Sequence, residues 1–227
     1  MSWFTSTISS SLGKKLIMSL TGLFLIIFLI GHLAGNMQLF FAENDGGLAF
    51  NIYAKFMTSN PAVMVLSYVT YISILGHVIY SIILTLHNKA ARPVGYAVST
   101  KDSQSMWTSR SMGVLGTFIL IFLVIHLKGF WFEMHWGDIG VDANGNKNLY
   151  AVVKAAYSQV WYVAVYVVSM LILAFHLSHG FSSAFQTLGI NHKKYTPFIK
   201  FLGKAFAIVV PLLFALIPIA MYLNNLG

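Results

Sequence analysis

The sequence predicts an all-α integral membrane protein in which five transmembrane helices form one bundle. Of its 227 residues, 57% are hydrophobic and only 9% are charged, whereas soluble domains carry about 25% charged residues. Five segments contain the roughly 20 apolar residues that a helix needs to cross a bilayer. They are residues 16–40, 62–87, 112–132, 157–185 and 198–223. Because the connections between them are short, we expect residues 1–227 to form a single transmembrane domain.

The first segment follows Lys14-Lys15, an arrangement that also occurs in signal peptides. The apolar stretch from Leu16 to Ala34 is longer than the apolar region of a signal peptide, which has about 7–15 residues. We therefore interpret it as a retained first span.

Proline marks two of the later helix starts. Ser59-Asn60-Pro61 opens the second span and Thr196-Pro197 opens the fifth, each with a capping residue before a proline at the first helical position. Within the fifth span, Pro211 and Pro218 are expected to bend the helix, because proline removes a backbone hydrogen bond.

The basic residues predict the orientation. Ten of the 14 lysines and arginines fall on one side of the five spans, and the positive-inside rule makes that side, with the N-terminus, cytoplasmic. They are Lys14, Lys15, Lys89, Arg92, Lys101, Arg110, Lys193, Lys194, Lys200 and Lys204. Acidic residues fall on the other side, as do aromatic residues that suit an outer interfacial belt: Glu43, Asp45, Glu133, Asp138, Asp142, and Trp131, Trp136, Tyr150 and Trp161.

The net charge of +8 therefore reflects topology and does not indicate a nucleic-acid partner, although part of it could form a docking face for a cytoplasmic protein. The chain has no cysteine, which excludes c-type haem attachment, thiolate iron–sulfur ligation and disulfides within it.

Four histidines lie deep in the first four spans, where an ionisable side chain is costly and indicates a functional site. Helical rise places His32 roughly 24 Å above Leu16 and His126 roughly 20 Å above Met112, both in the outer half. The same rise places His77 roughly 22 Å below Ala62 and His176 roughly 24 Å below Val160, both in the inner half.

This sorting predicts two bis-histidine haems stacked across the membrane, since imidazole is a common axial ligand and helix bundles hold cofactors between facing helices. His179 lies one turn from His176 and could replace it as ligand. A transition-metal site is less favoured, because two histidines at each level, with no acidic residue nearby, leave coordination incomplete. His87, His135 and His192 lie at the membrane edges and are interpreted as solvated.

Small residues flank the histidines and allow either cofactor space or close helix packing. They are Gly22, Gly31, Gly35, Gly76, Gly113, Gly116 and Gly180.

Several motifs resemble the cytochrome b membrane anchor of succinate:quinone oxidoreductases (succinate dehydrogenase and fumarate reductase), in its single-chain, five-helix, dihaem form. They are Gly13-Lys14-Lys15, His32-Leu33-Ala34-Gly35-Asn36, Ala49-Phe50-Asn51-Ile52-Tyr53, and the stretch from His176 to Gly189. The resemblance covers essentially the whole chain.

The resemblance implies that His32 and His126 ligate a distal haem b, and that His77 and His176 ligate a proximal one. It favours His176 over His179, because the family's fourth ligand is followed four residues later by a glycine, here Gly180.

It also implies electron transfer between a quinone, commonly menaquinone, and an iron–sulfur subunit. That subunit and a flavoprotein with bound FAD would dock on the cytoplasmic face of a bacterial inner membrane and carry the dicarboxylate chemistry. The chain would thus be part of a respiratory enzyme that links the tricarboxylic acid cycle to electron transport.

Partners for haem propionates and quinone are less clearly marked. Candidates for the propionates are Lys15, Ser19, Arg92, Ser109 and Arg110 at the inner level and Lys128 at the outer level, although lysines here could simply snorkel. Ser19 is supported by a serine at a similar position in the family. No glutamate matches the one that some members use near the start of the second helix, so the quinone candidates are Asn36, Gln38, Asn51 and Tyr53.

Two other functions remain open. A membrane cytochrome b of a hydrogenase or formate dehydrogenase would also pair histidines. A transporter or proton channel could use buried histidines without any haem.

Overall fold

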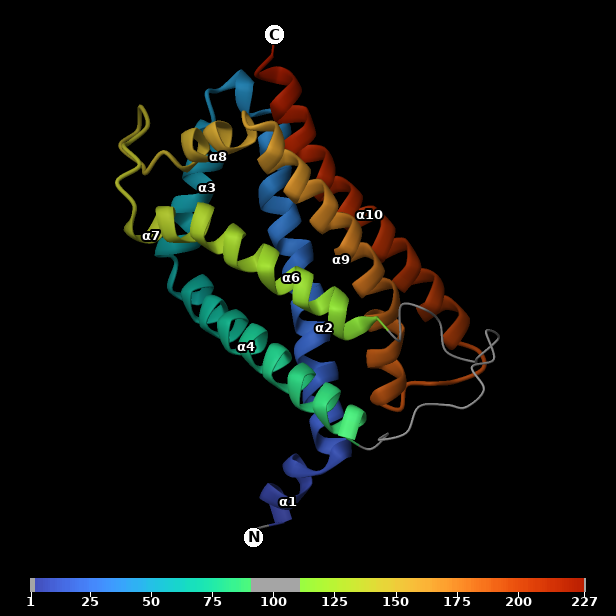
Figure 1. The fold of residues 1–227 in the computed structure, drawn as a ribbon. Helices are drawn as coiled ribbons and strands as arrows, with labels where there is room; N and C mark the ends of the chain where they lie inside the picture. Colours follow the sequence, from blue (N-terminus) through green and yellow to red (C-terminus); the bar gives the residue numbers. More distant parts are fainter. Residues whose placement is uncertain (1–2, 91–110, 227) are drawn as a thin grey trace.

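Helices form the whole framework of the computed structural model, which describes residues 3–90 and 111–226 and contains no strand within these ranges. Among these residues, five helices are long and apolar enough to cross a membrane (Figure 1). Their bounds are Ser11–Phe40 (α2, Ser11–Asn36, continued by the short helix η1, Met37–Phe40), Pro61–Ala90 (α4), Met112–Trp136 (α6, Met112–His126, continued by η3, Leu127–Phe132, and α7, Glu133–Trp136), Val160–Thr187 (α9) and Thr196–Asn224 (α10). The prediction of a multi-pass helical membrane protein is confirmed.

The fourth span begins later than the sequence suggested. The predicted start near residue 157 belongs to a separate helix, α8 (Leu149–Tyr157), and the spanning helix α9 begins at Val160. The break occurs at Ser158, whose hydroxyl donates to the Ala155 carbonyl oxygen at 2.7 Å. Serine favours such a helix end because its side chain competes for backbone groups.

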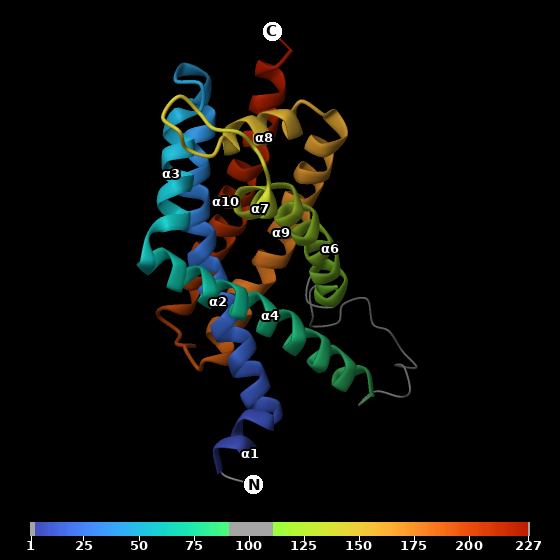
Figure 2. The ribbon, with the colours of Figure 1, turned by 90° about the vertical axis from the view of Figure 1, so that its left-hand side faces the viewer.

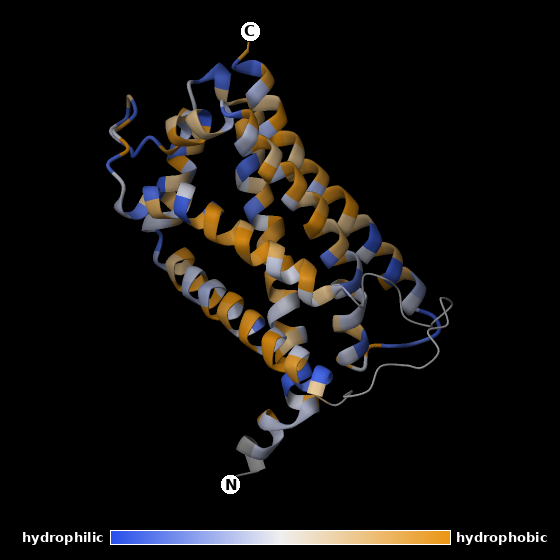
Figure 3. Ribbon diagram, viewed as in Figure 1, coloured by the Kyte–Doolittle hydropathy of each residue, from blue (hydrophilic) through white to orange (hydrophobic). Residues whose placement is uncertain are grey.

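The spanning helices pack into one bundle. Helices α9 and α10 lie side by side and antiparallel over most of their length, while α2 packs against α4 and α9 (Figures 1 and 2). Helix α6 packs mainly on α9. Coloured by hydropathy, the spans are apolar along their middles and polar near their ends, as expected for helices that face lipid (Figure 3).

The two ends of the bundle carry different segments. Helix α1 (Trp3–Ser9) and the turn between α9 and α10 lie at one end, and the C-terminus, α3 (Leu48–Ser59) and α8 lie at the other (Figure 1). Lys193 and Lys194 are therefore at the N-terminal end, as the topology argument expected. That this end is cytoplasmic stays a prediction.

Of the two predicted helix starts with a capping residue before a proline, one is confirmed. Asn60 caps α4, since its Oδ1 accepts from the backbone N–H groups of Ala62 at 3.0 Å and Val63 at 3.3 Å. The prediction for Thr196 is wrong: it is already the first residue of α10, and its hydroxyl donates to Asn191 Oδ1 at 2.7 Å. Thr196 thus closes the preceding turn instead of capping the helix. Pro211 and Pro218 both lie inside α10.

A polar cap covers the C-terminal end of the bundle; it consists of α3, α8 and the loop from Gly137 to Asn148. Asn51 of α3 is fully buried there. Its Oδ1 accepts from the Tyr150 backbone N–H at 2.9 Å, and its Nδ2 donates to Asn148 Oδ1 at 3.1 Å. Asn148 also caps α8 by accepting from the Ala151 N–H. A single buried amide therefore joins two helices that are far apart in sequence.

Tyr150 and Glu43 occupy positions that the sequence did not indicate. Tyr150 was expected in an interfacial belt but is buried, with its ring against Gly47, where a Cβ would clash. Its hydroxyl donates to Glu43 Oε1 at 2.9 Å, and Lys154 Nζ lies 2.9 Å from the same oxygen. Lys154 and then Tyr150 hold the pKa of Glu43 below its usual value, while burial and then Glu43 raise the pKa of Tyr150 to about 12. This support of the cap is present at neutral pH and is lost as the pH falls through the folded-state pKa of Glu43.

The Asn51→Ala variant should lower the free energy of unfolding by about 1–3 kcal/mol, because it leaves the Tyr150 N–H buried without an acceptor. Thermal unfolding of the purified protein in detergent measures the loss. Asn144→Ala, the same change at an exposed position of the cap, is the matched control and should have almost no effect. Equal stability of the two variants would contradict the structural role of Asn51.

Candidate functional site

The four deep histidines meet as two pairs of rings. His32 of α2 faces His126, the last residue of α6, with ring centroids 5.7 Å apart and ring planes at 89°. His77 of α4 faces His176 of α9, with centroids 6.3 Å apart and planes at 67°. The structure thus brings together the same pairs that helical depth predicted from the sequence, the outer pair and the inner pair.

The outer pair lies among aromatic side chains. Phe28 stacks on the His32 ring at 5.3 Å, and Phe122 and Phe130 lie 5.7 and 5.6 Å from the His126 ring. Immediately after His126, residues Leu127–Phe132 (η3) form a π-helical segment, a local departure that is frequent at functional sites. The predicted third span therefore continues beyond residue 132, to Trp136.

Tyr166 of α9 also belongs to the outer site, and the sequence analysis did not identify it. Its side chain is buried, and its hydroxyl lies 3.1 Å from His126 Nδ1. Tyr157, Tyr162 and Tyr166 form a group at intervals of five and four residues, which is the only sequence signal that pointed to this position. The three rings pack on one another, with centroid distances from 5.1 to 6.3 Å.

The inner pair has different polar neighbours. His77 Nδ1 lies 3.3 Å from the Thr21 hydroxyl oxygen, and that hydroxyl can donate to the Ile17 carbonyl oxygen at 2.8 Å. The Thr21 oxygen is then free to accept from His77. His176 Nδ1 is buried and has no hydrogen-bond partner among the described residues.

The geometry favours His176 over His179 as the inner partner. The ring that faces His77 is that of His176, and His179 lies one turn further along α9 and is half-buried. His87, His135 and His192 are exposed, in agreement with their interpretation as solvated residues.

Gly22 makes room for one of the inner rings. A Cβ at Gly22 of α2 would lie only 3.2 Å from His77 Cε1, whereas a Cβ at Gly116 of α6 would make an ordinary contact with His176 Cε1 at 3.9 Å. Gly35 also serves close packing, because the Tyr53 ring occupies the place of its missing side chain. Close packing thus accounts for Gly22 and Gly35, and space for a cofactor beside the other small residues stays a prediction.

These pairs fit the two axial positions of a haem iron. A metal ion between two imidazoles makes two bonds of about 2 Å, and each donor nitrogen lies a further ~1 Å from the centre of its ring. The centroids of two imidazoles that share one metal are therefore roughly 6 Å apart. The observed distances of 5.7 and 6.3 Å are close to this value. Within residues 3–90 and 111–226, no group of three or more His, Asp or Glu side chains converges as a metal site. The described residues thus offer pairs of ligands.

The candidate propionate partners are only partly described. Ser19 is buried, and its hydroxyl donates to the Lys15 carbonyl oxygen at 3.0 Å. The side chains of Lys15 and Lys128 are exposed. Arg92, Ser109 and Arg110 lie outside the described residues. For all six of these residues, the role as propionate partner stays a prediction.

The quinone candidates differ in how many of their polar side-chain atoms are already used in hydrogen bonds within the protein. Asn36 Nδ2 donates to the carbonyl oxygen of His32 at 2.8 Å, and Gln38 Nε2 donates to that of Gly35 at 3.2 Å. Tyr53 packs over Gly35. Asn51 uses both its amide oxygen and its amide nitrogen to hold the polar cap together.

Comparison of the chain with protein-family models, with curated proteins and with solved structures found no match. The class of protein that the fold and the site define is a multi-pass helical membrane protein with two facing histidine pairs between its spans.

Cysteine cross-linking should reproduce the pairing, because the natural chain has no cysteine to interfere. The double variants His32→Cys/His126→Cys and His77→Cys/His176→Cys should each be joined by a short bifunctional thiol reagent, detected by mass spectrometry of the linked peptides. His32→Cys/His77→Cys is the mismatched control: His77 packs at Gly22, which is about 15 Å from His32 along α2. Equal linking of the mismatched pair would contradict the arrangement.

Proposed function

We propose that this chain is a dihaem cytochrome b, the membrane anchor of a succinate dehydrogenase or fumarate reductase complex. It would transfer electrons between a membrane quinone, most naturally menaquinone, and an iron–sulfur subunit. The observation that carries the proposal is the meeting of four histidines from four spans as two facing pairs.

The ligand assignments follow from the pairing. His32 and His126 would hold the outer haem b, and His77 and His176 the inner one. Bound haem supplies one-electron transfer, while the protein contributes ligands, hydrogen bonds and low polarity. Tyr166 and Thr21 occupy the Nδ1 side of His126 and His77, which leaves Nε2 of each ring for ligation. The aromatic rings beside the outer pair give it apolar neighbours.

The two pairs lie at different depths along the bundle. Gly22 packs against the His77 ring, and His32 is ten residues further along the same helix, about 15 Å away. Two redox sites at this spacing would carry an electron across much of the apolar layer. This arrangement supports transfer between opposite membrane faces more directly than a single site would.

The ends of the bundle suit the two reaction partners. The N-terminal end, with Lys193 and Lys194 in the α9–α10 turn, would receive the iron–sulfur subunit and the flavoprotein with its FAD. The dicarboxylate active site would lie on those subunits, so this chain would act as the membrane subunit of the enzyme in a bacterial inner membrane. Asn36, Gln38 and Tyr53 remain the candidates for contact with quinone near the outer pair.

A pyridine haemochrome assay on the purified chain should give two haems b per polypeptide. His32→Ala and His126→Ala should each remove the same haem, and His77→Ala and His176→Ala should each remove the other, as reduced-minus-oxidised spectra would show. His87→Ala, at an exposed position, is the matched control and should retain both.

The outcomes separate the alternatives. A colourless chain would contradict the cytochrome and favour a transporter or channel. Loss of a haem from His179→Ala, with both retained in His176→Ala, would reverse that ligand assignment. Succinate-dependent quinone reduction by the native complex, which contains flavin and iron–sulfur clusters, would distinguish the proposal from a hydrogenase or formate dehydrogenase subunit.

A further inference from the structure

Tyr166 makes a polar contact to a proposed haem ligand from a third helix. Its hydroxyl lies 3.1 Å from His126 Nδ1, and its side chain is only 4% exposed. The other rings near His126 are His32, Phe122 and Phe130, of which the two phenylalanines have no hydrogen-bonding atom in the side chain. Tyr166 is therefore well placed to determine which nitrogen of His126 carries the proton.

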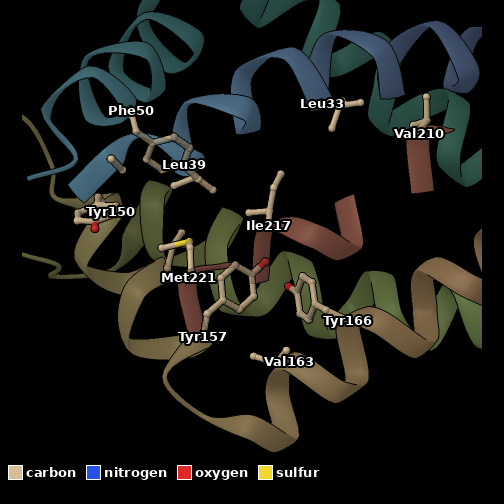
Figure 4. Packing of buried hydrophobic residues seen from close by; sticks show 12 residues of the cluster. Leu33, Leu39, Phe50, Tyr150, Tyr157, Val163, Tyr166, Val210, Ile217 and Met221 are labelled. Atoms are coloured by element: carbon tan, nitrogen blue, oxygen red, sulfur yellow. The ribbon is translucent and has the colours of Figure 1, made fainter. Parts of the chain in front are cut away.

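A neighbouring tyrosine offers the Tyr166 hydroxyl an acceptor. The Tyr166 proton can be donated toward Tyr157, whose ring centroid lies 5.2 Å from that of Tyr166. Figure 4 shows the two hydroxyls pointing toward one another between α8 and α9. Because a phenol has one proton and two lone pairs, the Tyr166 oxygen can then accept a hydrogen bond from His126.

We propose that Tyr166 is a positioning residue for the outer haem: it accepts the Nδ1–H of His126, fixes that tautomer, and presents Nε2 toward His32. The proposal rests on the function proposed above. A hydrogen bond accepted from the distant ring nitrogen makes the imidazole a stronger electron donor to its metal. Tyr166 would therefore stabilise the oxidised iron and lower the midpoint potential of the outer haem.

The inner pair has different neighbours at Nδ1, none of them a tyrosine among the described residues, so the effect of Tyr166 is specific to the outer pair. His77 has the Thr21 hydroxyl at 3.3 Å, and His176 Nδ1 has no partner in the described part of the chain. Removing the Tyr166 hydroxyl should consequently affect one haem and leave the other unchanged.

The test compares Tyr166→Phe with the wild type. Redox titration should show two haems in both, with an upward shift of one midpoint potential in the variant and no shift of the other. The low-spin ferric electron paramagnetic resonance signal of the same haem should change, because the His126 ring is free to leave its perpendicular orientation to His32. Tyr222→Phe, which removes a hydroxyl at the edge of the same core cluster, should shift neither potential.

A second measurement does not need haem. Nitrogen-15 NMR of histidine-labelled, haem-free protein should show the Nδ1–H tautomer at His126 in the wild type and a shift toward the other tautomer in Tyr166→Phe. If the Tyr166→Phe variant loses its haem, this NMR measurement still tests whether Tyr166 fixes the tautomer of His126. An unchanged tautomer, or unchanged potentials in a dihaem variant, would overturn the proposal, whereas a wild-type chain without haem would overturn the proposed function alone.

Discussion

A neutral imidazole between apolar helices has one donor and one acceptor nitrogen, and each loses its water when the helices assemble. An unpaired polar atom in such a place costs free energy, so the surrounding chain has to provide partners. Much of the arrangement within the bundle follows from this requirement. Tyr166 lies within hydrogen-bond distance of Nδ1 of His126, and Thr21 within hydrogen-bond distance of Nδ1 of His77, so each can satisfy one of the two ring nitrogens. The position of α9 matters most, because it supplies both Tyr166 and His176.

Hydrogen bonds are used differently around the histidine pairs in the spans and in the polar cap at the C-terminal end of the bundle. In the spans, most hydrogen bonds from hydroxyl side chains return to the same helix, as for Ser19, Thr70 and Ser169. In the polar cap, by contrast, side chains join segments that are far apart in sequence, through Asn51 and through Glu43 with Tyr150 and Lys154. The cap can hold the ends of α2, α3 and α9 in place at one end of the bundle.

Hydropathy and helical rise predicted the five spans and the partners of each histidine, because both depend on regular geometry along a single helix. They could not predict features that depend on contacts between helices. Tyrosine is typical of the membrane interface, yet Tyr150 is buried because Gly47 leaves room for its ring. Tyr166 is one apolar-looking aromatic among many in α9, and only the crossing of α6 reveals its contact with His126. The break after α8 was likewise missed, because Ser158 and Gln159 interrupt an otherwise apolar stretch for only two residues.

The sequence separation of the contacts in the polar cap determines when this part of the molecule can be completed. The hydrogen bonds that close it join residues 97 to 111 positions apart, from Asn51 with Asn148 to Glu43 with Lys154. During synthesis, α3 emerges before α4 and α6, and it cannot engage α8 until both of those spans have been made. The buried amide of Asn51 must therefore wait, still hydrated, through the synthesis of two membrane segments. Closure of the cap is consequently a late event in biogenesis, and it comes after the helices that carry the first three of the four paired histidines have left the ribosome.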